Sequence, residues 1–414
     1  MKADISILFA GDLCPIKGTE KAVLEGKSQE IIAPLGPSFF ERDIAVANLE
    51  GPLTKGGEPI KKTGPNIKID PGCIEFIKTA GFDIVTLANN HIGDFGLEPV
   101  LDTMRLLDDN GILFAGAGKN LADSRKSLYL EKKGIKIALL SYAEYEFGMA
   151  GGDTAGASPL DPVLAVRDIK SVSSRVDITM VVIHGGNERS PIPNPGVVNV
   201  YRVFADAGAS AVIGIHTHCP QGIEIYNGVP IIYSLGNFLF DYPYDQGRPE
   251  KDDFWWKGYM AKIQFSERPG ESTGTNRSFT ASVEAVPYSF WPDGTSIKPL
   301  DGEDREGFLR YLEHISSIIC NESEMSNLWD AWCLMNGPQW VDYFRKAQYP
   351  VTPEDTEAYA NTLILRNGFT CSAHYEVVRN FLRMICEGRI EKAGEYMDRM
   401  KALMKGTEDE TYAK

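Results

Sequence analysis

The stretch SAVIGIHTH (residues 210–218) is the most informative part of the sequence for the fold class. A short apolar run is followed directly by a pair of histidines. A run of this length, rich in β-branched residues, is typical of a strand buried on both faces of a sheet. His216 and His218 follow at the point where the chain would leave that sheet. Ligand and metal sites of open α/β folds collect at this carboxyl edge of the strands. The stretch therefore predicts an α/β protein with a site at its strand ends.

Four other apolar runs end in polar side chains in the same way. They are ISILFAGDLC (5–14), IAVANLEG (44–51), IVTLANNHIGD (84–94) and ITMVVIHGGNE (178–188). Helical periods between the runs predict helices at about 19–32, 72–80, 97–110, 160–175 and 198–208. Two more runs, IKIALLSYA (135–143) and VPIIYSLGNFLF (229–240), are also expected to be strands. Five strand ends would thus present carboxylate, amide and imidazole groups at one edge.

The chain changes character after residue 258. Residues 259–265 and 280–290 are predicted to be strands that flank a polar, glycine-rich hairpin tip at 266–278. From about residue 302 onward the pattern is almost wholly helical. We therefore expect a domain at 1–298 that carries the site and a helical C-terminal domain at 299–414.

Composition and charge exclude several classes of function. The chain has 414 residues and a formal net charge of -15, so nucleic acid is not an expected partner. No apolar run reaches the roughly 18–20 residues that cross a bilayer, so no integral membrane segment is expected. The seven cysteines contain no CxxC pair, which fits a reducing, cytoplasmic setting. The sequence leaves the oligomeric state open.

The polar groups at the strand ends match the ligands of a transition metal. Imidazole nitrogen and carboxylate oxygen together bind zinc, manganese or iron. On an extended segment, the side chains of an H-x-H pair point to the same side, so His216 and His218 are expected to reach one site. One or two divalent metal ions are therefore the expected cofactors.

The order of the motifs resembles the calcineurin-like metallophosphoesterases: GD, an acidic residue, NH, H and H-x-H. The spellings NLEG, ANNHIGDFG and SLGNFLFD are more similar to the CapA branch, the bacterial capsule or poly-γ-glutamate synthesis proteins. The resemblance covers residues 5 to about 240. It implies a four-layered metallophosphoesterase-like sandwich, in which two central sheets are flanked by helices. The strand and helix pattern alone supports only the α/β class.

The resemblance also implies roles at matching positions. Asp12 and His218 stand where the first metal is bound, and Glu50 stands where the family has a bridging aspartate. Asn90, His184 and His216 correspond to ligands of the second metal. His91 is similar to the histidine that faces substrate. Asp94 either accepts a hydrogen bond from an imidazole or caps the following helix.

This chain departs from the phosphoesterase pattern on the first-metal side. Cys14 stands where the D-x-H motif has its histidine, and Glu50 is one methylene longer than aspartate. Packing is the favoured role of Cys14, with thiolate ligation as the alternative. Binding of a single metal ion therefore remains an alternative to binding of two. The residues expected to bind substrate or support the ligands are Cys14, Asn48, Asn89, Glu188 and Asn237.

Several other polar and aromatic residues are expected to be structural. Glu144 and Glu146 are interpreted as the end of a strand that leaves the core, and His314 and His374 as ordinary helix residues. The Trp255 and Trp256 pair and the tryptophans of the tail are expected to be buried against a neighbouring element, with a stacking platform for sugars as the alternative.

The function that the resemblance implies is metal-assisted hydrolysis of a phosphoester, with His91 protonating the leaving oxygen. The expected substrate is an anionic small molecule or a peptide-like polymer. The alternatives are a factor in capsule or poly-γ-glutamate synthesis, a metal-dependent peptide-modifying enzyme and a non-catalytic scaffold.

Overall fold

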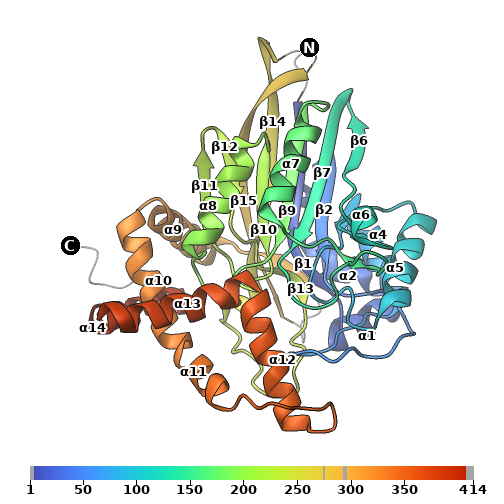
Figure 1. Cartoon of the computed structure of the whole chain (residues 1–414). Coiled ribbons are helices and arrows are strands. Elements are labelled where there is room, and N and C mark those ends of the chain that lie inside the picture. The colour runs from blue at the N-terminus through green and yellow to red at the C-terminus, as the bar shows by residue number, and fades with distance from the viewer. Residues whose placement is uncertain (1–3, 274–275, 292–295, 407–414) are drawn as a thin grey trace.

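The computed structural model describes residues 4–273, 276–291 and 296–406, and two β-sheets form its centre (Figure 1). The first sheet has eight strands, of which β1 to β4 run parallel and β14 to β16 antiparallel. Its order is β16 (Ser296–Pro299), β15 (Asn276–Trp291), β14 (Lys257–Thr273), β1 (Asp4–Cys14), β2 (Ile44–Leu49), β3 (Ile84–Thr86) and β4 (Leu113–Ala115), with β13 (Asn237–Phe240) also paired to β1.

The second sheet has six strands and a parallel centre. Its order is β11 (Ile223–Tyr226), β12 (Val229–Ile232), β10 (Ala211–Ile215), β9 (Ile178–His184), β7 (Ile135–Ala143) and β6 (Leu128–Lys132). A separate pair consists of β5 (Ala117–Gly118) and β8 (Gly156–Ala157).

The strand pleat explains why the first sheet lies between two apolar layers. Successive side chains of a strand point to opposite faces. In β1, Ile7 and Phe9 belong to a hydrophobic cluster that includes the second sheet. Leu8 and Ala10 belong to a different cluster, which contains the buried faces of helices that follow β1, β2 and β3. These helices are α1 (Lys17–Leu24), α2 (Ser28–Ile32), α4 (Ile74–Ala80) and α5 (Leu97–Asp109).

Helices α7 (Pro162–Ser173) and α8 (Pro195–Asp206) cover the second sheet and complete the fourth layer (Figure 1). Each begins with proline after a capping residue, as helices favour. Asp161 accepts hydrogen bonds from the Val163 and Leu164 amides, and Asn194 accepts one from the Val197 amide. The predicted four-layered α/β class is confirmed.

Short helical turns connect these layers. They are α3 (Pro37–Phe40), α6 (Leu121–Ser124) and the 3-10 turns η1 (Ala33–Leu35), η2 (Pro71–Cys73) and η3 (Phe254–Trp256).

The C-terminal part of the chain is helical and lies across the lower ends of the sheets in Figure 1. Its helices α9 and α10 contribute Ile315 and Leu328, both fully buried, to the same hydrophobic cluster as the second sheet. The division into domains at 298/299 stays a prediction. The helices are α9 (Gly302–Ile319), α10 (Glu322–Asn336), α11 (Pro338–Arg345), α12 (Thr356–Thr370), α13 (Ser372–Glu387), α14 (Ile390–Gly394) and α15 (Met397–Lys405).

Three sequence predictions were wrong in detail. The run 229–240 is two strands in different sheets, because the chain turns at Leu235–Gly236 and passes from β12 to β13. The stretch 266–278 is mostly paired strand, with Ser272 opposite Arg277, although residues 274–275 lie outside the described part. The helix expected at 19–32 is divided into α1 and α2 around Gly26, whose φ is 82°.

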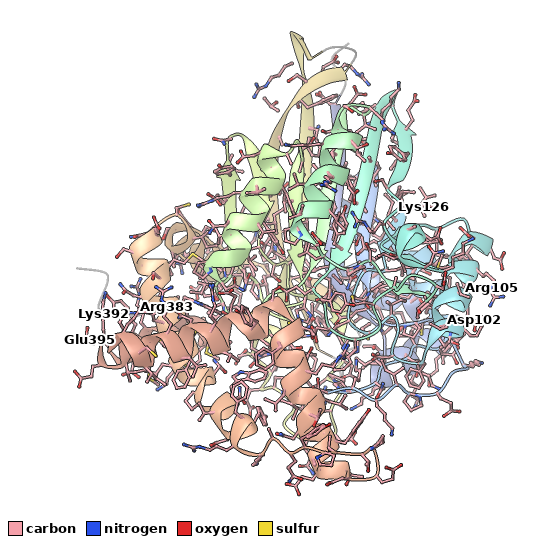
Figure 2. All side chains as sticks on the ribbon, in the orientation of Figure 1. Asp102, Arg105, Lys126, Arg383, Lys392 and Glu395 are labelled. Atoms are coloured by element: carbon pink, nitrogen blue, oxygen red, sulfur yellow. The ribbon has the colours of Figure 1, made fainter. Side chains whose placement is uncertain are left out.

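Charged side chains lie on the outer faces of the helices (Figure 2). Asp102 and Arg105 form an ion pair on α5, and Arg383 pairs with Glu387 on α13. Exposed pairs of this kind contribute little to stability, so the cores hold the layers together. No helix in the described ranges is long and apolar enough to cross a membrane.

Candidate metal centre

The ends of four parallel strands bring the predicted ligands together. Asp12 lies near the end of β1, Glu50 directly follows β2, His184 ends β9 and His216 directly follows β10. Ligand atoms of Asp12, Glu50 and His184 lie within 4.8 Å of one another. Those of Glu50, His216 and His218 form a second such group. Glu50 belongs to both groups, as a residue shared by two metal ions would.

Asn90 belongs with His184 and His216. The Asn90 Oδ1 atom lies 3.0 Å from His184 Nε2, which in turn lies 2.9 Å from His216 Nδ1. Asn90 Oδ1 and His216 Nδ1 thus both contact His184 Nε2. His184 Nε2 is also 3.7 Å from Glu50 Oε1, so this group adjoins the shared carboxylate.

The surroundings of the Glu50 carboxylate show whether a cation fits the site. Both of its oxygens are buried, and neither has a hydrogen-bond partner among the described residues. Burial, followed by the neighbouring Asp12, raises the pKa of Glu50 well above its usual value, and burial raises that of Asp12 to about 6. Unpaired buried carboxyl groups are costly unless a positive charge compensates them. A divalent cation provides that charge, so the residues fit a metal.

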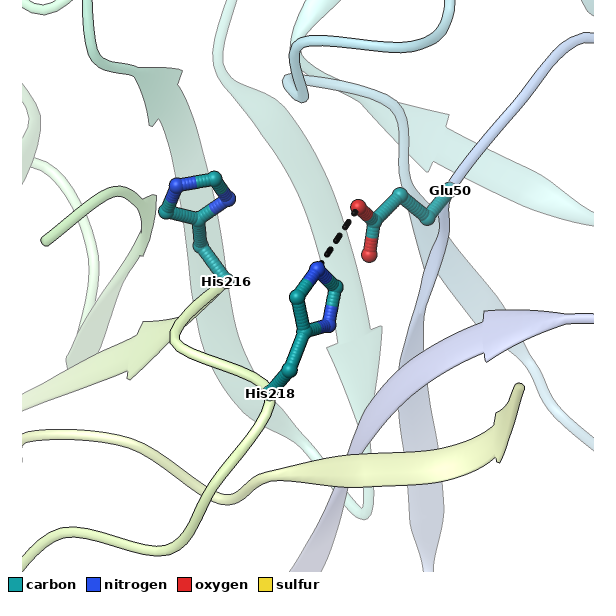
Figure 3. Close-up of side chains that lie close together, drawn as sticks. All are labelled: Glu50, His216 and His218. Atoms are coloured by element: carbon teal, nitrogen blue, oxygen red, sulfur yellow. Dashed lines mark ion pairs between the residues drawn. The ribbon is translucent and has the colours of Figure 1, made fainter. Parts of the chain in front are cut away.

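The histidines are in the protonation state that a metal requires. Burial, followed by the adjacent His216, lowers the pKa of both His184 and His218 well below the usual value. Both rings are therefore neutral near pH 7, and neutral imidazole is the ligand form. Figure 3 shows His218 and His216 on one loop facing Glu50, with the His218 Nε2 to Glu50 Oε1 distance at 3.9 Å.

The backbone at His216 and His218 is not extended. The expectation that extended backbone directs both side chains to the same side was therefore wrong. His216 has φ of 99° and His218 has φ of 54°, in a region that non-glycine residues rarely adopt. The rings nevertheless converge, with centroids 5.9 Å apart. Backbone strain of this kind persists where the surrounding structure over-determines it and is concentrated at functional sites.

His91 is held by a carboxylate and faces the shared glutamate. Its Nδ1 atom lies 2.6 Å from Asp94 Oδ2, and its Nε2 atom lies 3.9 Å from Glu50 Oε1. Asp94 also accepts hydrogen bonds from Lys62 and from the Ile67 amide. Gly96 and not Asp94 occupies the N-cap of α5, so the capping alternative is excluded. Burial, and then Lys62, lowers the pKa of His91, while Asp94 opposes the shift.

Buried amide side chains support the ligands. Asn48 donates to Asp12 Oδ1 at 2.9 Å and lies 3.3 Å from His184 Nδ1. Asn89 accepts from the backbone amide of His91 and so shapes the turn after β3. Asn237 Oδ1 lies 2.8 Å from His218 Nδ1, which fixes that ring and leaves Nε2 toward Glu50. These three predicted residues lie beside the centre.

Cys14 belongs to neither group of ligand atoms. It is fully buried in the hydrophobic cluster on the helix-covered face of the first sheet. Burial, and then the charge of Glu50, raises the pKa of its thiol well above the usual value. A neutral, packed thiol agrees with the favoured structural role.

A cavity of about 300 Å³ opens onto the centre. Asn90, His91 and His218 line its floor, and the predicted Glu188 lines it from an exposed position. Residues from α10 to α13 form another side of this cavity.

Sequence reasoning missed several residues of this pocket. Lys62, whose side chain is 3% exposed, lines it beside His91. Glu146, expected to be structural, lies 3.7 Å from His216 Nε2, and Asn367 donates to it. His374, expected to be an ordinary helix residue, also lines the pocket. Trp255 is buried as expected, but against His218 at a ring distance of 4.6 Å.

Comparisons with known proteins bear on the strand-end half of the chain. A model of the family described as bacterial capsule synthesis protein PGA_cap matches residues 6–242. The PGA biosynthesis protein CapA of Bacillus subtilis (strain 168) is 31% identical over 242 residues, covering 57% of this chain and 63% of that protein. The capsule biosynthesis protein CapA of Bacillus anthracis is 26% identical, covering 57% of this chain and 60% of that protein. The chain therefore spans about three fifths of the length of these relatives.

Solved structures show more distant similarity. A 5'-nucleotidase precursor from Thermus thermophilus aligns with a TM-score of 0.39 and 12% identity, covering 77% of this chain and 60% of that one.

Proposed function

The chain belongs to the bacterial capsule synthesis protein PGA_cap family, and from that premise we propose that it is a metal-dependent hydrolase of a phosphoester. Glu50 carries the proposal, because its carboxylate has no hydrogen-bond partner among the described residues and belongs to two groups of ligand atoms, of which His218 lines the open pocket. On this proposal Asp12, Glu50 and His184 would hold one cation, and Glu50, His216 and His218 would hold a second, as the two groups of ligand atoms pair them. Asn90, whose Oδ1 lies 3.0 Å from His184 Nε2, would join the first set. The resemblance implies the sets with His184 and His218 exchanged.

Bound divalent cations supply Lewis acidity, which lowers the pKa of water and offsets negative charge on phosphoryl oxygens. Manganese, zinc and iron all accept this nitrogen and oxygen donor set. The buried carboxyl groups and the overall charge of -15 would otherwise repel an anionic substrate.

We propose that His91 moves a proton in this reaction. Hydrolysis forms a bond from a water oxygen to phosphorus, with loss of one water proton to solvent. It breaks the bond to the alcohol oxygen, which must gain a proton. His91 borders the pocket, and Asp94 holds its Nδ1 so that Nε2 faces the reacting groups. An anionic phosphoryl group nearby favours the protonated ring and counters the lowering of its pKa by burial. We assign His91 as the general acid and Asp94 as its positioning residue.

Lys62 adds a positive charge on the same side of the pocket. Its ammonium group contacts Asp94 and lies 3.1 Å from His91 Nδ1. We propose that Lys62 orients the phosphoryl group, while Asp94 holds its ammonium group in place.

The test combines metal analysis with a substrate screen. Purified protein is analysed for metal per chain and assayed on phosphomonoesters, phosphodiesters and γ-glutamyl peptides. His91→Ala should keep its metal and its circular dichroism spectrum but lose about 10²–10⁴ in turnover. The loss should be smallest for p-nitrophenyl phosphate, whose leaving group needs no proton.

The matched control is His314→Ala, a histidine of α9 that does not line the pocket. It should leave metal and turnover unchanged. The proposal fails if the purified protein holds no transition metal, or if His91→Ala keeps full activity on esters with poor leaving groups.

A further inference from the structure

Helices outside the matched family region complete the pocket over the metal centre. Six of its lining residues, here called the helical wall, are Trp332, Asn336, Gln339, Trp340, Asn367 and His374. They come from α10, α11, α12 and α13 (Figure 1). The family model ends at residue 242, so the wall is a feature of this chain beyond the shared centre.

The helical wall is polar but contains no lysine, arginine, aspartate or glutamate. The other charged side chains of the pocket are Lys62, Glu146 and Glu188. Lys62 is already paired with Asp94, and the two glutamates would repel further carboxylates. On the proposed function Lys62 serves the phosphoryl group at the metal centre, so a polyanion that extended across this wall would meet no further lysine or arginine among the described lining residues.

Two buried atoms of the wall lack a hydrogen-bond partner among the described residues. They are the indole Nε1 of Trp332, a donor, and the amide Oδ1 of Asn367, an acceptor. Trp332 and Asn367 are only 5% and 4% exposed. Both atoms have less than 1 Å² of accessible surface, so a ligand in the pocket reaches them only through a small movement of the side chains. Leaving such groups unpaired is costly, and a ligand that pairs with them removes that cost.

The orientation of the Asn367 amide follows from its neighbour. Its Nδ2 donates to Glu146 Oε2 at 3.3 Å, and a carboxylate can only accept. The oxygen must therefore face away from Glu146. Glu146 in turn lies 3.7 Å from His216 Nε2, so the wall is tied to the metal centre through one carboxylate.

We infer that the helical wall binds the uncharged, hydroxyl-rich part of a sugar phosphate, whose phosphoryl group lies at the metal centre; this inference rests on the proposed function. A sugar hydroxyl both accepts and donates, as Trp332 and Asn367 together require. The cavity of about 300 Å³ is of a size for a small molecule. Poly-γ-glutamate, with a carboxylate on every residue, does not match this wall.

The test measures binding by calorimetry in the His91→Ala background, which should keep its metal but lose most turnover, with metal-loaded and metal-stripped protein. The probes are N-acetylglucosamine 1-phosphate, phenyl phosphate and tri-γ-glutamate. Trp332→Phe, which removes the N–H, and Asn367→Leu should each weaken binding of the sugar phosphate about tenfold. Binding of phenyl phosphate, which shares the phosphoryl group but has no hydroxyl, should change less than twofold.

The matched control is Trp329→Phe, a buried tryptophan of α10 that does not line the pocket. It should alter neither affinity. Because buried variants can lose stability, Gln339→Ala at an exposed position provides a second measurement and should weaken only the sugar phosphate, about threefold.

The outcomes separate this inference from the proposed function. Tighter binding of tri-γ-glutamate than of the sugar phosphate, or equal effects of Trp332→Phe on both phosphoesters, overturns the inference even if phosphoesters are hydrolysed. Sugar-phosphate binding that depends on Trp332 and Asn367, without turnover of any phosphoester, supports the wall and overturns the hydrolase.

Discussion

At the residue scale, the candidate centre consists of side chains whose burial costs free energy when each is buried without a partner. Asp12 and Glu50 are fully buried carboxyl groups, and His184 and His218 are buried rings with lowered pKa values. Each is tolerable only beside the others and a cation. Removing one member should therefore show first in metal affinity.

His184→Ala and His216→Ala should each weaken metal binding by more than about tenfold, because even residues behind a ligand change affinity by that much. Metal per chain after dialysis, measured by elemental analysis, reports the change. Equal metal content in both variants and the parent protein would show that neither ring is a ligand.

Cys14→Ser should leave the metal content unchanged, since the thiol belongs to the hydrophobic core. A hydroxyl without a partner in that core should lower the free energy of unfolding by about 1–3 kcal/mol. Urea unfolding measures the second effect. Loss of one equivalent of metal would instead identify the thiolate as a ligand.

The site residues that the sequence predicted and those that it missed differ in where they lie along the chain. Asp12, Glu50 and His184 sit at strand ends, where local pattern reveals both the strand and its edge. Lys62 lies in a long connection, and Asn367 lies on a distant helix. Their approach to the centre depends on tertiary packing, for which a single sequence has no periodic signal.

At the scale of elements, two errors have a common physical cause. The polar segment around Ser272 is typical of a loop, yet its backbone pairs with the strand beside it. The apolar run at 229–240 is typical of one strand, yet its hydrogen bonds go to two sheets. Side-chain polarity alone does not determine backbone pairing. The partner of a strand and the point where a strand ends can therefore be assigned only from the tertiary structure.

Gly222→Ala should destabilise the protein, because α9 packs directly on this glycine. An added Cβ would lie 2.7 Å from Ser316 Cα and 2.8 Å from Ile319 Cδ1. Overpacking of this kind costs about 1–3 kcal/mol, measurable by urea unfolding. Gly394→Ala is the control, since no atom lies within 4 Å of its Cβ position. Equal stabilities of the two variants would contradict the close packing of α9.

At the scale of the whole molecule, the C-terminal helices and the second sheet share one core. Buried residues of α9, α10 and α13 belong to the same cluster as β9 and β10. A protein can therefore carry its site on one part of the chain and still depend on another part for stability.

A chain that ends at residue 298 should lose most of its stability, more than about 5 kcal/mol, because it exposes the surface under α9 and α10. Thermal unfolding followed by circular dichroism compares it with the full chain. A cooperative transition at an unchanged temperature would show that residues 1–298 fold on their own.

The passage from β12 to β13 has a consequence for how the molecule opens. Only Tyr233 to Gly236 separate a strand of the second sheet from a strand of the first, so a short tether joins the two sheets beside the metal centre. We expect this tether to couple the opening of the two sheets. The slowest-exchanging amide protons of β1 and β10 should therefore exchange with deuterium through the same global opening, at the same free energy.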